Sequence, residues 1–88
     1  MQKSLKSPEY ARLIGLLVAV RKGSGMTQES LAKALKRPQS FVAKYEGGER
    51  RLDVIEFIAI ARALGADPIK LFGQFAKDMP ASRAKSRS

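Results

Sequence analysis

Two helical patterns follow each other so closely between residues 27 and 48 that only a tight turn can join them. Thr27 is a suitable N-cap for the first helix, because its hydroxyl can accept a free first-turn N–H. The apolar stripe of that helix is formed by Leu31, Ala32 and Leu35. Pro38 separates the two patterns, since a residue before proline is pushed out of the α region while proline itself fits a first helical position.

The second helix of this pair has a polar face opposite its apolar one. Its apolar stripe consists of Phe41, Val42 and Tyr45, and the helix ends at Gly47-Gly48. The opposite face carries Gln39, Ser40, Ala43 and Lys44. Such a helix fits the DNA major groove, where Gln pairs with adenine and Lys with guanine. One helix braced on the backbone and a second in the groove is the helix-turn-helix arrangement, so the stretch predicts that motif.

The motif extends into a longer pattern. The matching positions are Thr27-Gln28-Glu29-x-Leu31-Ala32 and Gln39-Ser40-x-Val42-x-Lys44-Tyr45-Glu46-x-Gly48, with Arg21 upstream and Leu52, Ile55, Ala61, Leu64 and Gly65 downstream. This pattern resembles the helix-turn-helix of the phage repressor and Cro family, also called the Xre family, over roughly residues 10–72. The resemblance implies an all-α, lambda-repressor-like domain of five helices.

The resemblance also implies roles for individual residues. The base-contact candidates are Gln39, as the main adenine reader, with Ser40, Lys44, Pro38 and Ala43. The phosphate-contact candidates are Gln28, Thr27, Arg37, Arg50 and Arg51. Arg21 and Glu46 are expected to form a structural ion pair that sets the angle of the second helix. Lys36-Arg37 stands where relatives have small residues in the turn, so the turn geometry is expected to differ.

The rest of the chain predicts three more helices. Ser7-Pro8 begins a first helix that runs to about Lys22, and Asp67-Pro68 begins a short last one. Asp53 and Glu56 form a capping box before a helix over residues 54–64. That helix is apolar almost all round, which predicts a central position with Ile55, Phe57 and Ile58 in the core. We expect a flexible arm at residues 1–7, the domain at 8–75 and a basic disordered tail at 76–88.

Charge and composition limit the classes of function that this chain can have. With 17 Lys and Arg against eight Asp and Glu, the net charge of +9 favours polyanionic partners. Double-stranded DNA is favoured over an anionic membrane by the helix-turn-helix pattern. The absence of Cys and His excludes disulfide scaffolds, thiol and imidazole catalysis and the usual zinc sites. No nucleophile stands beside a base, so we expect no enzyme, cofactor or metal. No signal peptide or membrane span is visible, which favours a cytoplasmic location.

These observations predict a transcriptional regulator that binds double-stranded DNA as a homodimer on an inverted repeat, with repression as the simple outcome. The candidates for the dimer surface are Ile69, Leu71, Phe72 and Phe75. A flank of the first helix around Ile14 and Val18 is the other candidate surface. One alternative is an antitoxin or a restriction–modification controller, in which the basic tail binds a protein partner. A second alternative is an adaptor that bridges proteins and binds DNA only incidentally.

Overall fold

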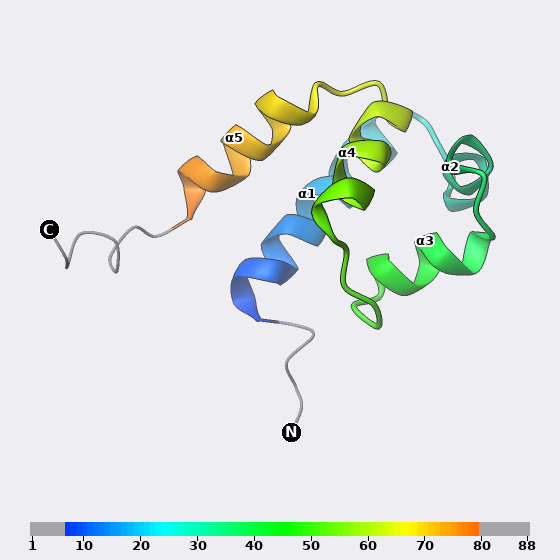
Figure 1. Cartoon of the computed structure of the whole chain (residues 1–88), viewed down its shortest axis with the longest axis horizontal. Coiled ribbons are helices and arrows are strands. Elements are labelled where there is room, and N and C mark those ends of the chain that lie inside the picture. Colours follow the sequence, from blue (N-terminus) through cyan, green and yellow to red (C-terminus); the bar gives the residue numbers. More distant parts are fainter. Residues whose placement is uncertain (1–6, 80–88) are drawn as a thin grey trace, which may run out of the picture.

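The computed structural model describes residues 7–79, which form five α-helices joined by short connections (Figure 1). The helices are α1 (Pro8–Gly23), α2 (Gln28–Leu35), α3 (Gln39–Glu46), α4 (Val54–Ala63) and α5 (Pro68–Asp78). No strand occurs in this range, so the predicted all-α fold of five helices is confirmed. Of the predicted arm and basic tail, residues 1–6 and 80–88 lie outside the described part, and α5 continues past residue 75 to Asp78.

Helices α2 and α3 lie at one end of the molecule and α5 at the other, with α1 and α4 between them (Figure 1). The largest fully buried side chains come from the first four helices: Leu17, Leu31, Val42, Tyr45 and Ile60. Helix α5 adds Leu71 to this core. Its far end is tied to α1, because Arg12 Nη1 donates to the carbonyl of Asp78 at 3.0 Å.

Short-range hydrogen bonds begin the helices at the residues that the sequence indicates. The Ser7 hydroxyl accepts the Tyr10 N–H at the start of α1. Thr27 caps α2 by accepting the Ser30 N–H at 3.0 Å. At α4, Asp53 accepts the N–H of Glu56 while the Glu56 carboxylate accepts the N–H of Asp53, which confirms the predicted capping box. A cap of this kind contributes about 1 kcal/mol to stability.

The turn between α2 and α3 depends on an unusual backbone conformation at Lys36. This residue has φ 60° and ψ 41°, in the left-handed region that glycine normally occupies at a helix end. The N–H of Lys36 reaches the Lys33 carbonyl, and the N–H of Arg37 reaches the Ala32 carbonyl at 3.0 Å. Pro38 then occupies the N-cap of α3 rather than its first helical position, one residue earlier than expected. The chain therefore reverses without a glycine.

Helix α4 is less central than its apolar sequence predicts. Phe57 and Ile60 are buried and Ile58 is half-buried. Val54 and Ile55, however, are 69% and 74% exposed. The expectation that Ile55 belongs to the core is wrong, because the first turn of α4 is covered by other helices on one side only. The apolar residues on its open side therefore contribute to the molecular surface.

Candidate nucleic-acid interface

A chain of hydrogen bonds joins the starts of α2 and α3. Gln28 Nε2 donates to Glu46 Oε1 at 2.8 Å, and Gln39 Nε2 donates to Gln28 Oε1 at 3.4 Å. Because a carboxylate only accepts hydrogen bonds, the amide NH2 of Gln28 has to face Glu46 and its oxygen has to face Gln39. The Gln28 oxygen in turn orients the NH2 group of Gln39 toward itself. The side-chain oxygen and the second N–H of Gln39 then form an acceptor and donor pair that matches the major-groove edge of adenine.

The chain of hydrogen bonds begins at a buried ion pair. Arg21 Nε and Nη2 donate to the two carboxylate oxygens of Glu46, at 2.7 and 3.0 Å. Arg21 Nη1 donates to the Met26 carbonyl at 2.9 Å, just before α2. The hydrogen bond to Glu46 raises the pKa of Arg21 above its usual value. The pair thus joins the end of α1 to the end of α3, which is the contact expected from the sequence.

The base-contact candidates all lie on the outer surface of α3, from its N-cap to its last turn. The exposed residues of this group are Pro38, Gln39, Ser40, Ala43 and Lys44. Phe41 and Val42 point into the protein between them and are buried. The structure therefore gathers every predicted base-contact residue on one exposed helix face, while the apolar side of the same helix is fixed in the core.

The arginines predicted to contact phosphate have intramolecular partners. Arg50 binds Glu56 through two hydrogen bonds, and Arg37 Nη2 lies 3.2 Å from Glu56 Oε2. The hydrogen bond from Arg50 is the main cause that lowers the pKa of Glu56 to about 2. The hydrogen bonds from the Asp53 N–H and from Arg37 lower it further, against the opposing effect of partial burial. Sequence reasoning assigned Glu56 only to the capping box and missed these ion pairs. The excess of basic residues around the motif was the available signal that a carboxylate there would be shared.

Tyr10 holds the connection between α3 and α4 and was also missed. Its hydroxyl accepts the N–H of Leu52 at 3.0 Å and donates to the carbonyl of Arg50 at 3.3 Å. The guanidinium of Arg51 lies over the Tyr10 ring, 4.4 Å from its centroid. Burial raises the pKa of Tyr10 above its usual value. A tyrosine in line with the apolar face of the first helix was the sequence signal for this role.

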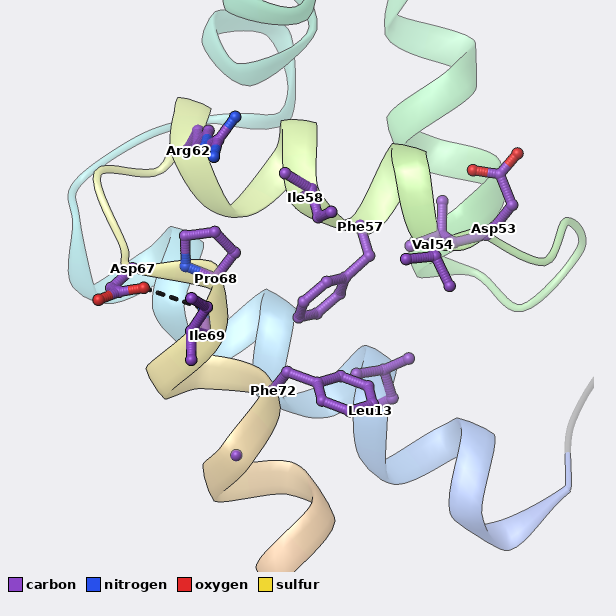
Figure 2. Close-up of a pocket in the computed structure, with 12 residues that line it drawn as sticks. Leu13, Asp53, Val54, Phe57, Ile58, Arg62, Asp67, Pro68, Ile69 and Phe72 are labelled. Carbon is purple, nitrogen blue, oxygen red and sulfur yellow. Dashed lines mark hydrogen bonds between the residues drawn. The ribbon is translucent and has the colours of Figure 1, made fainter.

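An apolar groove lies between α4 and α5, away from the helix-turn-helix (Figure 2). It encloses about 700 Å³, and Leu13 of α1 contributes to its lining. Ile69 is 81% exposed and Phe72 is 51% exposed, while Phe72 packs edge-on against Phe57 at 5.8 Å between ring centroids. Of the dimer candidates, Leu71 is buried in the protomer and Phe75 is half-buried. The surface that remains open is formed by Ile69, Phe72 and Val54.

With this geometry in view, the comparisons with known proteins decide the family. A helix-turn-helix family model matches residues 17–71. An XRE-family like protein from Pseudomonas syringae pv. tomato str. DC3000 is 47% identical, with a TM-score of 0.79 over 82% of this chain and 88% of that one. The chain belongs to the Xre family of helix-turn-helix proteins. The family match and the shared fold support a DNA-binding transcription regulator.

Two restriction–modification controller proteins are similar in structure to this Xre-family chain. C.AhdI from Aeromonas hydrophila is 27% identical, with a TM-score of 0.68 over 75% of this chain and all of its own (100%). C.Esp1396I, solved as a tetramer in complex with its natural 35 base-pair operator, has a TM-score of 0.74 over 82% of this chain and 95% of its own. At 22% identity, the second likeness concerns the fold alone. The search of curated proteins finds no match.

Two features are absent from residues 7–79. None of the helices in this range is both long and apolar enough to span a membrane. The same residues contain no group of acidic side chains placed to hold a metal ion.

Proposed function

We propose that this Xre-family chain is a repressor that binds an inverted repeat in double-stranded DNA as a homodimer and blocks the promoter that contains it. The observation that carries the proposal is the hydrogen-bonded chain from the buried Arg21–Glu46 pair through Gln28 to Gln39. A solvated surface amide needs no such support. An amide that reads a base does, because its donor and acceptor have to be presented in a fixed order.

In the proposed complex, α3 lies in the major groove and Gln39 reads adenine. Ser40, Lys44, Pro38 and Ala43 face the neighbouring bases from the same exposed surface. Gln28 and Thr27 at the start of α2 face the sugar–phosphate backbone, and the N-terminus of α2 is directed at a phosphate of that backbone. The basic residues beside α3 add phosphate contacts, which position the protein without reading sequence.

The homodimer part of the proposal rests on the apolar groove between α4 and α5. One helix-turn-helix contacts only a few base pairs, and a two-fold dimer doubles the site with half-sites about 34 Å apart. The exposed Ile69 and Phe72 offer an apolar surface that a second copy can cover. Helix α5, which carries both residues, lies at the opposite end of the molecule from α3, so two recognition helices would flank the two-fold axis (Figure 1).

The proposal is tested by selecting binders from a pool of random DNA duplexes and measuring the affinity of the enriched sequence. The matched variants are Gln39→Ala and Gln74→Ala. Gln74 is exposed on α5, so its loss removes the same amide at the other end of the molecule. We expect an inverted repeat to be enriched, and Gln39→Ala to lower affinity about tenfold and relax one position in each half-site. Gln74→Ala should bind like the native chain.

Two results would overturn the proposal. The first is a selection that enriches no sequence although the protein binds DNA in low salt. The second is an enriched sequence that Gln39→Ala and Gln74→Ala bind equally well. In the first case the chain is a basic protein that binds DNA without reading it.

A narrower function within the same class is control of a restriction–modification system, which the likeness to C.AhdI favours. The discriminating observation is the location of the enriched sequence in the source genome. A controller should bind upstream of neighbouring nuclease and methyltransferase reading frames. A site upstream of unrelated genes would contradict that function and leave the general repressor proposal intact.

A further inference from the structure

Two arginines on either side of α3 share one internal carboxylate. Arg50, in the loop after α3, donates from Nη1 to Glu56 Oε1 at 2.9 Å and from Nη2 to Glu56 Oε2 at 2.7 Å. Arg37, in the turn before α3, donates from Nη2 to the same Oε2 at 3.2 Å. Glu56 belongs to the first turn of α4, so one carboxylate holds guanidinium groups from both ends of α3.

An aromatic ring fixes where these two guanidinium groups lie. The central carbon of Arg37 is 4.0 Å from the centroid of the Phe41 ring, and that of Arg50 is 4.8 Å away. Phe41 is only 8% exposed and packs edge-on against Tyr45, so the ring is a rigid support. Stacking on the ring and pairing with Glu56 together determine the positions of both cations.

The carboxylate of Glu56 presents to these arginines the same kind of acceptor that a DNA phosphate would present. Guanidinium groups bind carboxylate and phosphate oxygens through the same paired N–H geometry. The Arg37 and Arg50 side chains are 38% and 39% exposed, whereas the Glu56 side chain is only 18% exposed. A phosphate can therefore approach both arginines from solvent, but it competes with an acceptor already in place. The carboxylate also halves the net charge of the cluster.

We propose that Glu56 is an internal competitor of DNA phosphate for Arg37 and Arg50, and that it limits the affinity of this protein for DNA of any sequence. The inference deepens the proposed function and rests on it for the orientation of α3 toward DNA. Phosphate contacts carry no sequence information, so the competition weakens binding to an operator and to an unrelated duplex alike. A regulator restrained in this way is held less tightly by the excess of non-operator DNA.

The test is a salt titration of binding to a random-sequence duplex, for the native chain, Glu56→Gln and Glu49→Gln. Gln still completes a capping box, so Glu56→Gln keeps the start of α4. Glu49→Gln changes the net charge equally in the nearby loop, but Glu49 is not one of the partners of Arg37 or Arg50. We expect Glu56→Gln to raise affinity roughly threefold to tenfold and to steepen the salt slope by about one phosphate contact. Glu49→Gln should have a smaller effect on both.

A second comparison separates competition from a general change in structure. Arg37→Gln should weaken binding more in the Glu56→Gln chain than in the native chain, because Glu56 no longer occupies the arginine. Equal losses in both chains would overturn the proposal. So would weaker binding by Glu56→Gln in a chain whose circular dichroism at the assay temperature is native-like, since Glu56 would then orient the arginines for DNA. A random duplex needs no operator, so these results are independent of whether the selection enriches a sequence.

Discussion

Gln28 has a role at the residue scale that its position in a first turn does not reveal. It transmits the fixed orientation of Glu46 to Gln39, because its amide bonds to both. We predict that Gln28→Ala leaves Gln39 in contact with DNA but free to rotate its amide. Discrimination between adenine and the other bases at the Gln39 position should then fall about threefold or more. The measurement compares affinities for the enriched duplex and for duplexes substituted at that position.

The contrary outcome for Gln28 is equally measurable. If Gln28 only binds phosphate, Gln28→Ala will weaken binding to all these duplexes by one common factor and flatten the salt slope. The ratio of affinities, rather than either affinity alone, therefore decides between the two roles.

Glu56 should also leave a signature in the pH dependence of stability. Its pKa is lowered from 4.5 to about 2, first through the hydrogen bond from Arg50. A carboxyl whose folded pKa is depressed stabilises the fold above its unfolded pKa, and this contribution is lost as the pH falls from about 4.5 toward 2. We predict that the native chain loses more stability than Glu56→Gln over this interval. Urea unfolding of both chains at a series of pH values measures it, and parallel profiles would contradict the prediction.

The residues that the sequence predicted best are those whose role depends on spacing within one helix or cap. Thr27 and Asp53 cap their helices, and Phe41 and Val42 are buried, because each of these roles is decided by residues a few positions away. Glu56 was understood only as a cap, since its pairing with Arg37 depends on how α4 meets the α2–α3 turn and its pairing with Arg50 depends on the path of the α3–α4 loop. Contacts between elements are not encoded in local periodicity.

At the scale of elements, the α2–α3 turn contains a strained residue that can be relieved. Lys36 adopts a left-handed conformation in which a side chain is disfavoured and glycine is not. We predict that Lys36→Gly stabilises the protein by about 0.5–1 kcal/mol, after allowing for the greater flexibility of glycine in the unfolded chain. Lys33→Gly, at an exposed position inside α2, should instead destabilise it by about 1 kcal/mol. Urea unfolding of the two variants should therefore give changes of opposite sign.

Helix α4 shows where an element-level prediction from sequence stops. An apolar pattern on all sides predicted full burial, yet Val54 and Ile55 are exposed. A hydrophobic side chain that is buried within the protomer and one that is exposed on its surface look the same in a sequence. The distinction becomes visible only once the neighbouring helices are placed, because it depends on which side of α4 they leave open.

At the scale of the whole molecule, the proposed division of labour places DNA binding at the α2–α3 end and self-association at the α5 end (Figure 1). A substitution at Ile69 tests this division, because Ile69 is 81% exposed and lines the groove without belonging to the core. We predict that Ile69→Glu is folded but monomeric, since a charge would have to be buried in the dimer. An acidic residue in the first turn of α5 is compatible with that helix. Sedimentation equilibrium measures the change in mass.

The same variant separates the two surfaces when DNA is added. A monomer with an intact α3 should still bind a single half-site as the native chain does, but should lose the gain in affinity that an inverted repeat provides. Gln74→Glu is the matched control, because it places the same charge on an exposed position of α5 outside the groove lining. It should remain dimeric. A native mass for Ile69→Glu would show that the groove between α4 and α5 does not hold the second copy, and would direct the search to the Val18 flank of α1.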